Sequence, residues 1–122
     1  MSSRDPLVVN SSEVDEYMVG ANGDEGAIRR LISRDQGSSL LLGLFKLEPG
    51  QRGEFSLPHV NGMEEETYFL LAGRLGVAWD GGEFVAEPGA AIFFPPGRTY
   101  RIETIGDTAV ELVWTGFPAP RA

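Results

Sequence analysis

The chain contains no cysteine and only one histidine, His59, among its 122 residues. Without cysteine it can form neither disulfide bonds nor thiolate metal sites. Basic residues are also scarce, because 10 lysines and arginines stand against 18 aspartates and glutamates, which gives a net charge of −8. Such an acidic chain offers no positive surface to nucleic acid or to an anionic membrane, so neither is expected as a partner.

Long apolar runs are missing as well. No stretch of the sequence approaches the roughly 20 apolar residues that a membrane-spanning helix needs. The first residues, Met1–Pro6, also lack the apolar run of a signal peptide. The sequence therefore predicts a cytoplasmic protein.

Glycine and proline, in contrast, are plentiful and predict an all-β fold. The 16 glycines and eight prolines interrupt the chain at short intervals and leave little room for long helices. Hydrophobic residues make up 42% of the chain, enough for one core in one domain. Short strands separated by turn signals are typical of a sandwich or barrel. The predicted strands are Ser39–Lys46, Glu66–Ala72, Gly76–Trp79, Glu83–Ala86, Ala90–Phe94, Thr99–Ile105 and Val110–Thr115.

The chain divides into three predicted parts. Residues 1–35 are polar and rich in turn signals, and we expect a short arm that packs on the barrel or on a neighbouring subunit. Within this arm, Ile28–Ser33 is predicted to be a strand. Residues 36–117 form the barrel, and residues 118–122 form a short C-terminal tail.

Alternation along the strands predicts which side chains face the core. The strand Glu66–Ala72 is largely apolar on both faces, which favours a central position in its sheet. The charged Glu66 at its start then needs a partner, because burial of a lone carboxylate is costly. The side chains predicted to point inward from two other strands are Tyr100, Ile102, Thr104, Val110, Leu112 and Trp114.

Two stretches place polar residues at fixed distances from glycines. The first, from Gly53 to Gly73, has the spacing G-x5-H-x-N-x4-E-x6-G. Its polar positions are His59, Asn61 and Glu66. The second, which starts at Gly89, has the spacing G-x5-P-x-G-x2-Y-x3-T and ends with Tyr100 and Thr104 as its polar positions.

These stretches resemble the two signature motifs of the cupin family, G-x5-H-x-H-x4-E-x6-G and G-x5-P-x-G-x2-H-x3-N. Every interval matches, and with the flanking strands the resemblance covers roughly Ser39–Thr115. It implies a double-stranded β-helix, the small jelly-roll barrel of the cupins. Because such barrels are commonly dimeric, we expect a homodimer.

The departures from the family pattern concern the metal ligands. The typical cupin site uses both histidines and the glutamate of the first motif, and the histidine of the second. Here Asn61 and Tyr100 stand at two of these positions, so only His59 and Glu66 remain of the usual set. With Tyr100 as a third ligand, the donors suit iron or manganese better than zinc. A divalent metal held by His59, Glu66 and Tyr100 is therefore one alternative, although firm binding usually needs three protein ligands.

Acid–base chemistry without a metal is the other alternative. A carboxylate beside an imidazole orients the ring and stabilises its charged form, so His59 and Glu66 can act as a catalytic pair. Tyr100 or Tyr68 could then donate a proton to a developing oxyanion. Such a set suits isomerisation, dehydration, cyclisation or lyase chemistry on a small carbonyl compound. The resemblance adds precedent, because some cupin sugar epimerases and polyketide-cyclase-like cupins work by acid–base chemistry.

Each further candidate for the pocket also has a simpler interpretation. Asn61 is followed by glycine, and Asn-Gly is itself a turn signal. The aromatic candidates belong to the core by default and become pocket walls only if the barrel is open on their side. The arginine could pair with a substrate carboxylate, although a surface position is the simpler interpretation. These candidates are Asn61, Phe45, Phe93, Trp114 and Arg52.

Three functions are compatible with the sequence, and in all of them the expected partner is a small molecule. The first is an enzyme that acts on a small carbonyl compound by non-redox acid–base chemistry. It is favoured by the retained pair His59 and Glu66 in a barrel lined by apolar and aromatic groups. The alternatives are a metal-dependent cupin oxygenase and a non-catalytic small-molecule-binding protein.

Overall fold

The computed structural model describes residues 5–121 of the chain, which form strands and two single 3-10 turns, η1 (Ser11–Glu13) and η2 (Arg34–Gln36). Within the described residues, no helix has the length and apolar character required to cross a membrane. The strands are β1 (Tyr17–Met18), β2 (Ala27–Ile32), β3 (Leu41–Leu47), β4 (Arg52–Leu57), β5 (Glu65–Ala72), β6 (Leu75–Trp79), β7 (Gly82–Ala86), β8 (Ala91–Phe94), β9 (Arg98–Thr104) and β10 (Val110–Phe117).

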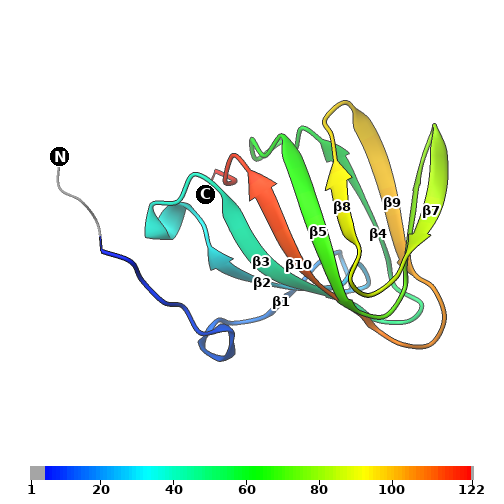
Figure 1. Ribbon diagram of the computed structural model, residues 1–122, viewed down its shortest axis with the longest axis horizontal. Helices are drawn as coiled ribbons and strands as arrows, with labels where there is room; N and C mark the ends of the chain where they lie inside the picture. Colours follow the sequence, from blue (N-terminus) through cyan, green and yellow to red (C-terminus); the bar gives the residue numbers. More distant parts are fainter. Residues whose placement is uncertain (1–4, 122) are drawn as a thin grey trace.

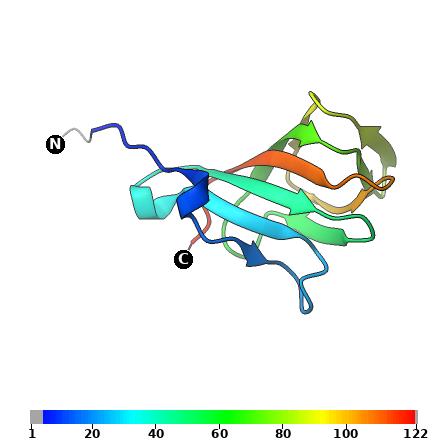
Figure 2. The ribbon, with the colours of Figure 1, turned by 90° about the horizontal axis from the view of Figure 1, so that it is seen from below.

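The strands form two antiparallel sheets that face each other as a jelly-roll barrel (Figures 1 and 2). The six-stranded sheet has the order β1-β2-β3-β10-β5-β8, and the four-stranded sheet has the order β4-β9-β6-β7. Figure 1 shows β3, β10, β5 and β8 side by side, with β4, β9 and β7 to their right. Strands far apart in the sequence are thus neighbours, and residues of both motifs come to line one interior.

All seven strands predicted for the barrel are present, with ends shifted by a residue or two, and the predicted strand Ile28–Ser33 is β2. β4 was not predicted, because its glycine and charged residues leave only two apolar members in the strand. Along β4, Phe55 and Leu57 alternate with the exposed side chains of Arg52 and Glu54. This alternation was the signal that could have revealed the strand.

The core lies between the sheets and confirms the predicted alternation. Tyr100, Ile102, Val110, Leu112 and Trp114 are all buried. β5 is an interior strand between β10 and β8, as predicted, but its two faces differ. Its inner residues are buried, whereas the outer Phe69 and Leu71 are 44% and 53% exposed.

The two ends of the described chain behave differently. The segment before η1 extends away from the barrel in both views (Figures 1 and 2). β2, in contrast, pairs along β3 and so enlarges the six-stranded sheet, and its Arg29 donates to the Ser11 carbonyl of η1 over 2.8 Å. At the other end Ala119 is buried, and its backbone N–H donates to the Ser39 carbonyl over 2.8 Å. Residues 1–4 of the predicted arm and residue 122 of the predicted tail lie outside the described residues.

Candidate functional site

A cavity of about 210 Å³ lies between the two sheets. Its walls come from the inner faces of β2, β3, β4, β5, β9 and β10 and from the turn before β5. The lining includes four aromatic side chains and several groups capable of acid–base chemistry. The lining residues include His59, Glu66, Tyr68, Phe55, Trp114 and Asn61.

His59 and Glu66 are in direct contact in this cavity. The imidazole Nε2 of His59 lies 2.7 Å from Oε2 of Glu66, which is a short hydrogen bond. The Glu66 side chain is only 3% exposed, whereas that of His59 is 27% exposed. The carboxylate is therefore the buried anchor, and the imidazole is the member of the pair that a ligand can reach.

Two further contacts fix the position of His59. Its ring is stacked on Phe55, with ring centres 5.9 Å apart and planes inclined by 25°. Its backbone N–H donates to the carbonyl of Met63 over 2.7 Å, which closes the turn between β4 and β5. The ring is thus held by its backbone, by an aromatic face and by a carboxylate, which limits its freedom before any ligand binds.

The contact with Glu66 also assigns the proton on a neutral imidazole. An ionised carboxylate only accepts hydrogen bonds, so Nε2 carries the proton and donates it to Glu66. The second ring nitrogen, Nδ1, then keeps its lone pair. Nδ1 has no hydrogen-bond partner in the described part of the chain. It is therefore available as a base.

Tyr68 lies next to this pair on β5. It follows Glu66 by two residues, so both side chains point to the inner face of the strand, where Tyr68 is 6% exposed. Burial, and to a smaller extent the negative charge of Glu66, raises the pKa of the Tyr68 hydroxyl well above its ordinary value near 10. The hydroxyl thus stays protonated over the physiological range. Among residues 5–121 it has no hydrogen-bond partner, so its O–H is free to donate to a ligand.

Asn61, Phe45 and Trp114, which the sequence proposed as pocket residues, also line the cavity. The side chain of Asn61 is used in a turn, because its Oδ1 accepts the backbone N–H of Met63 over 3.1 Å. This is the turn interpretation that the following glycine favoured. One of the two acceptor sites of the amide oxygen is thereby used within the turn.

Three of the predicted site residues lie elsewhere. Tyr100 is buried on β9, but its hydroxyl donates to the Pro95 carbonyl over 2.6 Å and does not line the cavity. Burial raises the pKa of this hydroxyl, and the charge of Arg98 opposes the shift. Phe93 points to the outer side of β8 and is 58% exposed, because the alternation of that strand turns its two neighbours inward.

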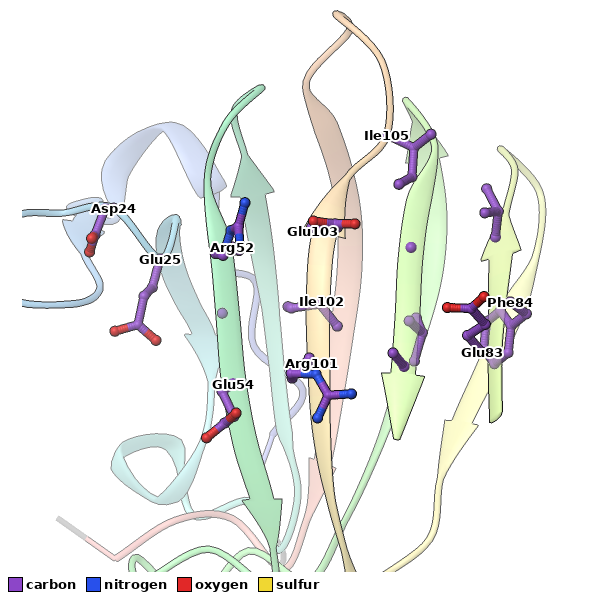
Figure 3. A pocket seen from close by; sticks show the side chains of 15 residues that line it. Asp24, Glu25, Arg52, Glu54, Glu83, Phe84, Arg101, Ile102, Glu103 and Ile105 are labelled. Atoms are coloured by element: carbon purple, nitrogen blue, oxygen red, sulfur yellow. The ribbon is translucent and has the colours of Figure 1, made fainter. Parts of the chain in front are cut away.

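Arg52 lies in a different hollow, a groove of about 680 Å³ along the four-stranded sheet (Figure 3). Its rim consists of exposed charged side chains on the outer face of the sheet. Arg52 lies opposite Glu103 in the pairing of β4 with β9, and Glu54 lies opposite Arg101. Alternating charges of this kind are typical of a solvated sheet surface. The groove is larger than the cavity, but it contains neither member of the His59–Glu66 pair.

Several residues of the cavity were not predicted from the sequence. Phe55 was missed together with its strand, although the alternation of β4 would have placed it inside. Arg30 and Glu25, which line the cavity from the arm, carried no recognisable signal, because the arm has no motif. Met63 is also part of the lining and is 1% exposed.

The donor set does not fit a firmly held metal ion. The facing atoms of His59 and Glu66 are hydrogen-bonded to each other. The Asn61 oxygen accepts a hydrogen bond from the Met63 N–H, and the Tyr100 hydroxyl donates one to the Pro95 carbonyl. No group of three histidine, aspartate or glutamate side chains in the described residues could hold a metal. Two protein ligands fall short of the three that a bound metal normally requires. The geometry instead matches a carboxylate-paired imidazole.

Comparison with known proteins decides the family. A family model described as the cupin domain (Cupin_2) matches residues 43–116, which is more than half of the chain. The chain belongs to the cupin family. An uncharacterized protein of Methanocaldococcus jannaschii is 30% identical over 66 residues, which are 54% of this chain and 53% of that protein. This cupin therefore spans about half the length of the curated relative that it matches.

Solved structures share the cupin fold over nearly the whole chain. A predicted oxalate decarboxylase of Thermotoga maritima is 24% identical, with a TM-score of 0.75, and 92% of this chain matches 99% of that one. Ectoine synthase from P. lautus is 14% identical, with a TM-score of 0.80 and coverages of 95% and 80%. The polyketide cyclase RemF of Streptomyces resistomycificus is 23% identical, with a TM-score of 0.73 and coverages of 100% and 83%. At these identities the likeness shows the fold alone.

Proposed function

We propose that this cupin is an enzyme that moves a proton on a small carbonyl compound, without redox chemistry. The observation that carries the proposal is the 2.7 Å hydrogen bond between His59 and Glu66 inside a cavity of about 210 Å³. It leaves the second imidazole nitrogen without a hydrogen-bond partner among the described residues, on a side chain that lines a cavity of a size suited to a small organic molecule. The classes of reaction that fit are isomerisation, dehydration, cyclisation and lyase chemistry.

The groups in the cavity have complementary roles in such a reaction. Nδ1 of His59 removes a proton from the carbon beside the carbonyl group, and Glu66 stabilises the imidazolium that forms. The electron pair of the broken C–H bond moves toward the carbonyl oxygen, which becomes negatively charged. The protonated hydroxyl of Tyr68 donates a hydrogen bond to that oxygen. Return of the proton to another carbon, or departure of a leaving group, then completes the reaction.

The comparisons support this proposal without selecting a substrate. The polyketide cyclase among the similar structures is, by its name, an enzyme of ring formation on the same fold. A metal-dependent oxygenase is less well supported, because no three histidine, aspartate or glutamate side chains among the described residues are grouped so that they could hold a metal. Proton abstraction needs only the His59–Glu66 pair, which is already in contact, and Tyr68 then supplies the donor to the carbonyl oxygen.

Deuterium exchange tests the proposal without knowledge of the natural substrate. The protein is incubated in D₂O with pyruvate, 2-oxobutyrate, acetoacetate or dihydroxyacetone, and proton NMR follows loss of the signal from the carbon beside the carbonyl. We expect the wild-type protein to accelerate exchange of at least one compound and His59→Ala to lose that acceleration. Arg52→Ala, outside the cavity, serves as the matched control. Equal exchange by wild type and His59→Ala for every compound would contradict the proposal.

A non-catalytic binding protein is the second candidate. It is favoured by the replacement of two typical ligand positions by Asn61 and Tyr100, whose side chains now have structural hydrogen bonds. A ligand that binds in the cavity of the wild-type protein without any proton exchange would favour this candidate over the enzyme.

The homodimer expected from the family resemblance also remains a proposal. It is supported by the outer face of the six-stranded sheet, where Phe69, Leu71 and Phe93 are exposed on the neighbouring strands β5 and β8. Exposed apolar groups that lie together are typical of interaction surfaces. Sedimentation equilibrium of the wild type and of Phe69→Glu tests it, with a dimer expected only for the wild type.

A further inference from the structure

The indole N–H of Trp114 is a buried hydrogen-bond donor without a partner among the described residues. Its side chain is 7% exposed, and it lines the cavity that contains His59. In the part of the chain that the structure describes, its indole Nε1 is the one buried side-chain nitrogen or oxygen without a hydrogen-bond partner. Buried donors are almost always paired, so an unpaired one at a cavity wall calls for an explanation.

The register of the sheet places Trp114 beside Tyr68. The two residues are paired across β10 and β5, and both side chains are on the inner face. The Tyr68 hydroxyl likewise has no hydrogen-bond partner among the described residues. Two neutral donors without partners among the described residues thus belong to side chains that are paired on adjacent strands and line the same cavity.

Gly43 determines how the indole of Trp114 is turned. It is paired with Trp114 on the other side, across β3, and it has no side chain to fill the inner face. A Cβ at this glycine would lie 3.0 Å from Cε3 of Trp114 and 2.8 Å from the carbonyl oxygen of Arg29. The benzene edge of the indole therefore occupies the space above Gly43. Because Cε3 and Nε1 are on opposite edges of an indole, the N–H edge is turned away from β3.

We propose that Nε1–H of Trp114 and the hydroxyl of Tyr68 together bind one carbonyl oxygen of the ligand. This inference rests on the proposed function and names its oxyanion-binding group. The ligand class is a small molecule whose carbonyl oxygen enters the cavity next to β5 and β10. Both donors are neutral and keep their protons, so they stabilise the negative charge that develops when His59 removes a proton. No co-reactant is needed.

The two tryptophans of the chain provide a matched test. Trp114→Phe removes the N–H but keeps an aromatic ring, and Trp79→Phe is the same substitution on β6, outside this cavity. In the deuterium-exchange assay we expect Trp114→Phe to be slower by about a hundredfold, as for loss of one oxyanion donor. We expect Trp79→Phe to match the wild type. Circular dichroism of both variants checks that they are folded.

A second readout tests binding apart from catalysis. The protein is labelled with ¹⁵N-tryptophan, and its two indole N–H signals are assigned with the two variants. Addition of the same four carbonyl compounds to the wild type and to His59→Ala should shift the Trp114 signal in a saturable way and leave that of Trp79 in place. Two results would overturn the inference. One is a Trp114 chemical shift that does not change with a compound whose deuterium exchange the protein accelerates. The other is a wild-type exchange rate in Trp114→Phe.

The two assays also separate this inference from the proposed function. A Trp114 signal that shifts while no compound is exchanged would support the carbonyl-binding role and contradict the enzyme. Exchange that depends on His59 but not on Trp114 would support the enzyme and contradict the role of Trp114. If no compound moves the Trp114 signal and none is exchanged, both proposals fail.

Discussion

The cavity between the sheets and the groove on the four-stranded sheet differ in size, in charge and in the state of their polar groups. The groove has about 680 Å³ and is edged by exposed arginines and glutamates (Figure 3). The cavity has only about 210 Å³, yet it contains a buried carboxylate, an imidazole held against it and two donors without partners among the described residues. Polar groups cost little at a solvated surface but much in the interior. The smaller space is therefore the better candidate for function.

The largest expected effect is that of His59→Ala on the exchange rate. Loss of a general base typically slows a reaction by about 10²–10⁴-fold, and we expect a decrease in this range. The exchange assay in D₂O measures it directly. Arg52→Ala in the groove should leave the rate unchanged, because Arg52 does not line the cavity. A large loss in Arg52→Ala together with full activity in His59→Ala would reverse our comparison of the two regions.

Tyr68→Phe is expected to slow exchange by about 10²-fold, because it removes one donor to the developing negative charge. Its stability should not fall, since the hydroxyl has no hydrogen-bond partner among the described residues and its removal therefore leaves no other group unpaired. Exchange rates and urea unfolding midpoints of the same variant check both statements. A variant that is much less stable but fully active would place Tyr68 in the core and not in the site.

Tyr100→Phe, in contrast, should lower the stability of the fold and leave the exchange rate unchanged. Its hydroxyl donates to the Pro95 carbonyl over 2.6 Å, so removing it costs about 1 kcal/mol of stability. The exchange rate should stay at the wild-type value, because Tyr100 does not line the cavity. Urea unfolding and the exchange assay test this variant beside Tyr68→Phe. Loss of exchange in Tyr100→Phe would restore the catalytic role that the motif position suggested.

The smallest expected effect concerns stability at alkaline pH. The pKa of Tyr68 is raised in the folded protein, whereas in the unfolded chain the residue loses its proton near pH 10. Above about pH 10 the folded state therefore binds more protons than the unfolded state, and stability falls as the pH rises. Tyr68 contributes at most about 1.4 kcal/mol per pH unit. Tyr68→Phe should thus lose stability less steeply than wild type, as measured by urea midpoints on both sides of pH 10.

The sequence predicted the strands of the barrel well, because most of them carry apolar residues with a period of two. β4 was missed, since its glycine and charged residues leave only Phe55 and Leu57 as apolar members. The motif spacing also directed attention to His59 and Glu66. Burial of Glu66 required a partner, and the structure places the imidazole of His59 at that position.

The remaining features of the site depend on geometry that spacing does not encode. Tyr100 and Tyr68 were equal candidates as proton donors. The structure distinguishes them, because the hydroxyl of Tyr100 donates to the Pro95 carbonyl and Tyr68 alone of the two lines the cavity. The free N–H of Trp114 depends on which way the indole turns, and Gly43 on the neighbouring strand controls that. Neither relation follows from the order of residues along one strand.

The measurement that tests the central claim most directly is ¹⁵N NMR of the single histidine. Since His59 is the only histidine in the chain, its two ring nitrogens give one unambiguous pair of signals. In the neutral ring we predict that Nε2, bonded to Glu66, carries the proton and that Nδ1 has the shift of an unprotonated nitrogen. A proton on Nδ1, with Nε2 unprotonated, would contradict the hydrogen-bonded pair on which the proposed function depends.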